Sequence, residues 1–302
     1  MRVLVTGGAG FIGSWTVAEL SKRGHDVIAT DKVVDSGIVQ TDITDLEAVL
    51  RLFDQAKPDA VVHLAAISGS TGKNEIEQSL RQAHQNFQVN TLGTANVCEA
   101  SRKSGVKKLI YMSSFAVYGR TGPDRLPITP DTPISLEHAY ATSKYAGELV
   151  VRNYSEDFGI SSTIFRTPFV VGEFQKERNV VKEFIEAAVG GEELVTFGDG
   201  RHVREFIHPL DLVKAYEIAI MQSDHFKYPT EIFVLGNTPI AIRDLASKII
   251  EKVGRGKMRF QLDSGSRAFN QYSDYSKAEK LLGWRPALSI TAIIERCVFS
   301  LR

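Results

Sequence analysis

The stretch MRVLVTGGAGFIGSWTVAELSKRGHDVIATD, residues 1–31, decides the fold of this chain. It begins with the apolar run Val3–Val5, which is short and β-branched enough for a buried parallel strand. An amphipathic segment that ends at Gly24 follows, and a second strand is expected over 26–30. Three glycines lie between the first strand and the helix, at a spacing of three residues: Gly7, Gly10 and Gly13. This order predicts a βαβ unit with a phosphate-binding turn.

The glycine turn and the residue after the second strand together indicate a dinucleotide site. Glycine lets the backbone approach a pyrophosphate closely, and a helix N-terminus offers free N–H groups and a partial positive charge. Asp31, eighteen residues after Gly13, is placed to accept hydrogen bonds from the adenosine ribose hydroxyls. A carboxylate at this position repels the 2′-phosphate of NADP, and the adjacent Lys32 weakens that repulsion only slightly. The predicted cofactor is therefore NAD.

The composition limits the classes of protein to which the chain can belong. Its 302 residues, 43% hydrophobic and 24% charged, suit one large or two modest globular domains. Basic and acidic residues both number 36, so no net charge points to nucleic acid or to an anionic membrane. We expect no signal peptide and no membrane span, and hence a cytoplasmic protein. The two cysteines, Cys98 and Cys297, are expected to be small buried hydrophobic residues. Neither a disulfide nor a metal site is predicted for them.

Beyond the first βαβ unit the chain keeps alternating strand and helix signals. A helix is expected from a cap at Asp45 to about Lys57, with apolar residues at i, i+3, i+4 and i+7. Strands over 59–66 and 108–114 follow, and the helix between them is expected to end near Arg102. This pattern predicts a doubly wound parallel sheet with helices on both faces and with ligands at the carboxyl ends of its strands.

Two features of this region invite a functional interpretation. The segment 67–85 is predicted to be an exposed loop beside the substrate, because it is polar. Its SGSTGK at 68–73 lacks the spacing of a P-loop. His63 lies inside an apolar strand, and no neighbour in the sequence would orient it as a base. We therefore expect His63 to be a core or lining residue.

A serine, a tyrosine and a lysine form the candidate catalytic set. Ser114 ends the strand expected over 108–114, and YATSK at 140–144 opens a helix that begins 26 residues later. A spacing of four puts Tyr140 and Lys144 on one helical face. A free tyrosine has a pKa of about 10, which a neighbouring lysine cation is expected to lower. With a serine hydroxyl holding the substrate oxygen, this set predicts removal of an alcohol proton beside a nicotinamide.

These motifs resemble those of the extended short-chain dehydrogenase/reductases, typified by UDP-glucose 4-epimerase and other nucleotide-sugar epimerases. The resemblance covers nearly the whole chain, in TGGAGFIG (6–13), Asp31, Asp42-Ile43, HLAA (63–66), VNTLGT (89–94), SSFAVYG (113–119), YATSK (140–144), VREFIH (203–208) and DYSKAEKLLGWRP (274–286). Together these stretches are highly specific for that family. They imply an NAD-dependent enzyme with a Rossmann-type α/β fold.

The resemblance also implies roles for individual residues. Ser114, Tyr140 and Lys144 become the catalytic set, with Ser114 on the substrate and Tyr140 and Lys144 also at the cofactor. The implied cofactor-binding residues are Gly7, Gly10, Phe11, Ile12, Gly13, Asp31, Asp42, Ile43, Leu64, Ala65 and Ala66. Of these, 42–43 would hold the adenine and 64–66 would follow the pyrophosphate and the nicotinamide ribose. Arg204, Arg267 and Asn179 would bind the diphosphate of a nucleotide sugar, with a solvated surface role as the alternative.

The domain layout is likewise implied by the resemblance. A dinucleotide-binding domain is expected over 1–167, to which 205–238 returns with a helix from Glu205 to about Gln222 and a strand over 231–235. A smaller α/β substrate domain is expected over 168–204 and 239–302. Helices near 84–102 and 140–157 commonly pair into a homodimer in such proteins. Candidate contact residues are Phe87, Val97, Leu149 and Tyr154.

Small departures from the family pattern bear on the reaction. Relatives that eliminate water carry an Asp-Glu pair after the position of Ser114, and decarboxylating relatives usually carry a Glu there, whereas this chain has Phe115-Ala116. The remaining reaction is oxidation at a carbinol carbon. Return of the hydride would make the protein an epimerase acting on C4 of a nucleotide sugar. Phe169 replaces a usual substrate-binding Asn and leaves open a dehydrogenase of a small sugar, uronate or amino alcohol that releases NADH.

Overall fold

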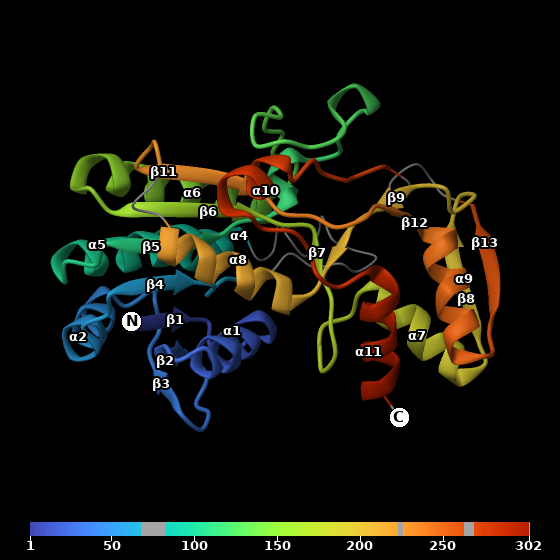
Figure 1. Ribbon diagram of the computed structural model, residues 1–302, viewed down its shortest axis with the longest axis horizontal. Helices are drawn as coiled ribbons and strands as arrows, with labels where there is room; N and C mark the ends of the chain where they lie inside the picture. The colour runs from blue at the N-terminus through green and yellow to red at the C-terminus, as the bar shows by residue number, and fades with distance from the viewer. Residues whose placement is uncertain (68–82, 223–225, 263–268, 302) are drawn as a thin grey trace.

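A seven-stranded, fully parallel β-sheet forms the larger part of the molecule (Figure 1). The computed structural model describes residues 1–67, 83–222, 226–262 and 269–301. The strands of the sheet are β1 (Arg2–Thr6), β2 (Asp26–Asp31), β3 (Ile38–Gln40), β4 (Ala60–His63), β5 (Lys108–Met112), β6 (Ser161–Arg166) and β11 (Thr230–Val234). Their order, β11-β6-β5-β4-β1-β2-β3, runs outward from β1 in both directions. The predicted doubly wound sheet is confirmed.

Helices cover both faces of this sheet because alternate residues of each strand point to opposite sides. Val3 and Val5 belong to one buried cluster, whereas Leu4 between them belongs to another. The first face is covered by α1 (Phe11–Lys22), α8 (Pro209–Gln222) and α10 (Ser276–Leu282). The second face is covered by α2 (Leu46–Ala56), α5 (Thr94–Lys103) and α6 (Ala139–Phe158), with the short α4 (Ala83–Phe87) beside α6.

A second group of elements forms its own hydrophobic core at the right of Figure 1. It contains α7 (Val180–Gly190), α9 (Ile242–Val253) and α11 (Ile290–Ser300), together with β8 (Glu193–Phe197) paired in parallel with β13 (Lys257–Gln261). Two short pairs join this group to the sheet: β7 (Phe169–Val170) with β10 (Phe206–Ile207), and β9 (Val203–Arg204) with β12 (Ile240–Ala241). The expected domain bounds stay a prediction.

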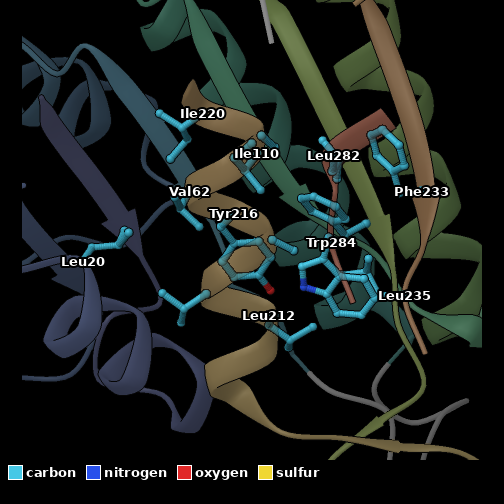
Figure 2. Packing of buried hydrophobic residues seen from close by; sticks show 14 of the residues in the cluster. Leu20, Val62, Ile110, Leu212, Tyr216, Ile220, Phe233, Leu235, Leu282 and Trp284 are labelled. Atoms are coloured by element: carbon cyan, nitrogen blue, oxygen red, sulfur yellow. The ribbon is translucent and has the colours of Figure 1, made fainter. Parts of the chain in front are cut away.

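One part of the predicted substrate segment packs on the large sheet. Trp284 follows α10 and is fully buried, and its indole N–H donates to the backbone oxygen of Asp211 at 2.8 Å. Figure 2 shows its ring among Tyr216, Leu235 and Leu282, inside the cluster that covers the first face. The segment 239–302 therefore contributes to both cores.

Several expected element bounds are wrong, each for a local reason. The three-residue strand β3 was not predicted, because it is short and partly exposed. The strand expected over 59–66 stops at His63: the Leu64 N–H still reaches the Thr6 carbonyl at 3.2 Å, but the Ala65 N–H bonds to the Thr6 hydroxyl at 3.2 Å. The strand expected over 108–114 stops at Met112. The returning helix begins at Pro209 instead of Glu205.

The segment between β4 and β5 also departs from the expected single helix. It contains a π-helical stretch, η1 (Gln88–Gly93), between α4 and α5. Two 3-10 turns, η2 (Phe115–Tyr118) and η3 (Pro123–Arg125), follow β5. Within the described ranges no helix is both long and apolar enough to cross a membrane. The predicted cytoplasmic location stays a prediction.

A buried carboxyl at the junction of β9 and β10 predicts how stability depends on pH. Glu205 is 1% exposed and accepts hydrogen bonds from the Ser273 N–H at 3.0 Å and the Ser273 hydroxyl at 2.8 Å. Burial raises the pKa of Glu205 from 4.5 to about 8. The folded protein therefore holds one more proton than the unfolded chain between these two values, so stability falls as the pH rises through this window.

The substitution Glu205→Gln tests this expectation, because glutamine resembles the protonated carboxyl in shape and does not titrate. The wild-type melting temperature should fall between about pH 5 and pH 8 by more than that of Glu205→Gln. Thermal unfolding followed by circular dichroism measures both, with the exposed Glu192→Gln as the control. Parallel curves for wild type and Glu205→Gln would contradict the assignment.

Candidate active site

The glycine turn after β1 lies against the backbone that follows β4. Gly7 has a φ of 71°, and a Cβ added to it would lie 2.7 Å from the Ala65 nitrogen. A Cβ on Gly13 would overlap the carbonyl oxygen of Gly7. Neither position can carry a side chain without moving backbone, so the turn and the first turn of α1 pack as closely as a pyrophosphate cradle requires.

The N-terminus of α1 is suited to an anion. Gly10 is its N-cap, and no side chain among the described residues caps it. The first turn of α1, which includes Phe11 and Ile12, holds no acidic residue. The free N–H groups and the positive end of the helix dipole therefore point at the place where a phosphate would bind.

Asp31 ends β2 beside this turn. Its carboxylate accepts hydrogen bonds from the Ala9 N–H and from the Val33 N–H, each at 3.2 Å. The side chain is thus fixed next to the glycine turn, as expected of a ribose-binding acid. The carboxylate of Asp42 accepts from Thr44, and the side chain of Ile43 is buried against Gly93. Their predicted contacts with the adenine stay a prediction.

His63 belongs to the scaffold of the site, as expected. Its Nδ1 lies 2.6 Å from the Thr6 hydroxyl and its Nε2 lies 3.0 Å from that of Thr94. Since the Thr94 hydroxyl donates to the Asn90 carbonyl at 2.7 Å, we assign the imidazole proton to Nε2. Burial lowers the pKa of His63 to about 3, and the nearby Lys144 adds to this. The neutral imidazole of His63, through its two hydrogen bonds, connects β1, β4 and α5.

The candidate catalytic residues come from the end of β5 and the start of α6. Ser114 caps η2, since its Oγ accepts from the Ala116 N–H at 3.2 Å. Tyr140 and Lys144 lie one turn apart on α6. Lys144 is 3% exposed, and its Nζ lies 4.2 Å from the centre of the Tyr111 ring. Ser114, just past the carboxyl end of β5, thus shares a hydrogen bond with Tyr140, and Lys144 lies one helical turn further along α6.

The charge states at this site differ from the expected ones. Burial raises the pKa of Tyr140, and a hydrogen bond with the Ser114 side chain opposes that rise. Burial lowers the pKa of Lys144 to about 7, while the carboxylate of Glu148 opposes that fall. The expectation that a neighbouring lysine cation lowers the tyrosine pKa is therefore wrong for this state, because burial raises the pKa of Tyr140 instead.

One residue that the sequence did not single out fixes the catalytic helix. Asn90, in the π-helical stretch, donates from Nδ2 to the Ser143 hydroxyl at 3.0 Å and to the Ile67 carbonyl at 3.1 Å. Ser143 in turn donates to the carbonyl of Tyr140 at 2.9 Å. Gly147 permits this contact, since a Cβ there would meet the Asn90 carbonyl oxygen at 2.9 Å. The only signal in the sequence was the VNTLGT match.

Asn179 and Arg204, the expected substrate residues that the structure describes along with Ser114, each have partners within the protein. Asn179 caps α7 by accepting from the Lys182 N–H at 3.0 Å, and it donates to Gln175 at 2.8 Å. Arg204 is buried, its guanidinium lies 3.9 Å from the Phe269 ring centre, and burial lowers its pKa to about 10. Arg267 and the loop expected over 67–85, apart from 67 and 83–85, lie outside the described residues. The substrate roles stay predictions.

Comparison with known proteins identifies the class. Residues 3–236 match the NAD dependent epimerase/dehydratase family. A putative UDP-glucose 4-epimerase of Methanocaldococcus jannaschii is 31% identical, over 98% of this chain and 97% of the relative. This chain therefore belongs to the NAD-dependent epimerase/dehydratase family, and its cofactor is NAD, as the sequence predicted.

Solved structures agree with this assignment. UDP-glucose 4-epimerase of Thermotoga maritima, crystallised with UDP-glucose, is 28% identical with a TM-score of 0.87, covering 100% of this chain and 99% of that one. The dTDP-glucose 4,6-dehydratase DesIV of Streptomyces venezuelae, crystallised with NAD, is 26% identical with a TM-score of 0.85, covering 100% and 97%. The chain is thus similar to both epimerases and dehydratases, and it is an enzyme of this family with the extended short-chain dehydrogenase/reductase fold.

The position of Asp31 predicts the preference between NAD and NADP. Replacing Asp31 by Ala, or combining Asp31→Ser with Lys32→Arg, should weaken NAD binding and improve NADP relative to it, because the repulsion of a 2′-phosphate is removed. Asp31→Asn is the matched control, since it keeps an acceptor for the Ala9 N–H but loses the charge. Titration calorimetry with both dinucleotides measures the ratio. Tighter binding of NADP than of NAD by the native protein would contradict this role.

Proposed function

We propose that this protein is an NAD-dependent epimerase that inverts a sugar carbinol, at C4 of a nucleotide sugar, by transient oxidation to a ketone. The observation that carries the proposal is the hydrogen bond between Ser114 and Tyr140, one helical turn from Lys144, in a fold whose first strand ends in a glycine turn suited to a dinucleotide. Similarity over almost the full chain to UDP-glucose 4-epimerases supports the choice of a nucleotide sugar.

Each member of the set has a separate task in this reaction. The Tyr140 phenolate takes the carbinol proton while the Ser114 hydroxyl holds the same oxygen. The ammonium of Lys144 favours that phenolate through its charge. NAD supplies a hydride acceptor that returns the hydride. Inversion requires the ketone to present its other face before Tyr140 gives the proton back.

The neighbours of Ser114 favour epimerisation over elimination of water. Phe115 is buried and Ala116 is half-buried, so the two positions after Ser114 offer no carboxyl group. Removal of water from a sugar needs a general acid for the departing hydroxyl and a base for the carbon acid. The side chains at these two positions supply neither. This supports an epimerase over a dehydratase, a class to which the fold is also similar.

A dehydrogenase acting on a small sugar, uronate or amino alcohol is the second candidate. Phe169, on β7, replaces the asparagine that the family resemblance implies for binding the substrate. Its side chain is partly exposed, and its ring centre lies 6.1 Å from that of Phe206. An apolar ring at this position offers no hydrogen bond to a sugar hydroxyl. Such an enzyme would have to release NADH at every turnover.

An assay for both products separates the two candidates. We expect the purified protein to carry NAD and to interconvert C4 epimers of a nucleotide sugar without net formation of NADH. Chromatography of the sugar nucleotides and absorbance at 340 nm measure the two outcomes together. Steady growth of free NADH with a sugar or sugar acid, and no epimer, would establish the dehydrogenase instead.

The variant Tyr140→Phe tests the role of the phenol in the same assay. It should lower the rate by ~10²-fold or more, because the proton carrier is lost, while NAD stays bound. Tyr145→Phe, one turn and one residue further along α6, is the matched control, with an expected rate close to that of the wild type. A Tyr140→Phe rate near the wild-type value would show that another group moves the proton.

We further propose that the protein is a homodimer joined through α4, α5 and α6. Exposed apolar side chains on these helices and the π-helical stretch support the proposal: Phe87, Leu92, Leu149 and Phe158. Of the contact residues expected from the sequence, Phe87 and Leu149 are exposed, whereas Val97 is fully buried and faces the sheet. Tyr154 is half-buried, and its hydroxyl donates to Glu99 at 3.3 Å.

Charge placed on this surface should separate the subunits. Leu92→Glu and Leu149→Glu are expected to give monomers, because each would bury a carboxylate in an apolar interface. Leu281→Glu, on α10 and similarly exposed, is the control and should leave the dimer intact. Light scattering at micromolar concentration measures the mass. A monomeric native protein would rule out this dimer.

A further inference from the structure

A buried ion pair lies between the catalytic helix and the sheet. Glu148 lies on α6 and is 1% exposed, and Arg166 lies at the end of β6 and is 3% exposed. Two nitrogens of the guanidinium bond to the two oxygens of the carboxylate. The Nη2 of Arg166 donates to Oε2 at 2.7 Å, and its Nε donates to Oε1 at 3.0 Å. The Ser113 hydroxyl donates to the same Oε1 at 2.5 Å. This carboxylate of α6 thus contacts both β6 and the residue that directly follows β5.

The guanidinium extends the contact to the segment after the catalytic serine. The Nη1 of Arg166 donates to the Tyr118 hydroxyl at 2.8 Å and to the Pro130 carbonyl at 3.1 Å. Tyr118 belongs to η2, the turn that Ser114 caps. Since Ser113 directly precedes Ser114, the pair holds the strand end and the turn on both sides of that serine.

Glu148 also lies one helical turn beyond Lys144 and two beyond Tyr140. Among the described residues, the titratable groups that face Lys144 come from three elements: His63 on β4, Tyr111 on β5, and Tyr140 and Glu148 on α6. His63 and Tyr111 are neutral, because burial lowers the pKa of His63 to about 3 and raises that of Tyr111. Glu148 is therefore the anion that favours the charged form of Lys144.

We propose that Glu148 is a positioning residue for the reaction: it fixes Ser114 opposite Tyr140 through Ser113 and Arg166, and it places its carboxylate one helical turn from Lys144. This inference rests on the proposed roles of Ser114, Tyr140 and Lys144. A buried ion pair contributes little net stability compared with apolar residues of equal size. We attribute the presence of this ion pair to the effect of the Glu148 carboxylate on Lys144, one helical turn away.

Direct titration of Lys144 tests the proposal without any substrate. Lysine labelled with ¹³C at Cε and ¹⁵N at Nζ gives a signal that is assigned by its loss in Lys144→Arg. In Glu148→Gln the pKa of Lys144 should fall by about one unit or more, since the anion is gone and the Arg166 cation is left uncompensated. Glu148→Asp should retain most of the wild-type value. An unchanged pKa in Glu148→Gln would overturn the proposal, whatever reaction the enzyme catalyses.

Two further variants separate charge from packing. Ser113→Ala removes the 2.5 Å contact without changing charge, so it should leave the Lys144 titration in place. Glu148→Gln combined with Arg166→Met removes both charges and should restore the melting temperature if the single change destabilises the fold. In this double variant the Lys144 pKa should remain low, and the rate should recover only toward acidic pH. Recovery of the wild-type pH profile together with stability would show that Glu148 is merely structural.

Discussion

The close contact between the backbone of Gly7 and that of Ala65 is the constraint on which the rest of this structure depends. It brings the ends of β1 and β4 together at the carboxyl edge of the sheet, and it leaves no room for a Cβ between them. The Thr6 hydroxyl completes the contact by accepting the Leu64 and Ala65 N–H groups. The anion-binding end of α1 and the strand ends that lead to the catalytic residues are therefore parts of one rigid edge.

Behind this edge, the polar groups of the core are of two kinds. Some are neutral because burial makes a charge costly, and His63 with its two threonine partners is the example. Others stay charged because an opposite charge meets them with good geometry, as Glu148 and Arg166 do. Lys144 lies between these two cases, with a pKa of about 7.

The sequence was sufficient to predict the features that follow from a local pattern of residues, namely the glycine turn, the first strand and the cap of α2. Glycine spacing, the apolar run Val3–Val5 and the Asp45 cap have the same structural consequences in most settings, and the structure confirms the turn, the strand and the cap. The ends of strands could not be predicted in the same way. Leu64 and Ala65 are as apolar as the strand before them, and their N–H groups bond to Thr6, which lies 58 or 59 residues away in the sequence. The same limit applies to Asn90, whose partners lie 23 and 53 residues distant.

The two parts of the molecule are also joined at the helix that begins the cofactor site. Trp15, on α1, packs edge-on against His208 with ring centres 5.3 Å apart. His208 lies 2.8 Å from the carboxylate of Glu173, which also accepts from Arg296 of α11. The helix that begins at the glycine turn is thus linked, through His208 and Glu173, to the helix that closes the smaller core.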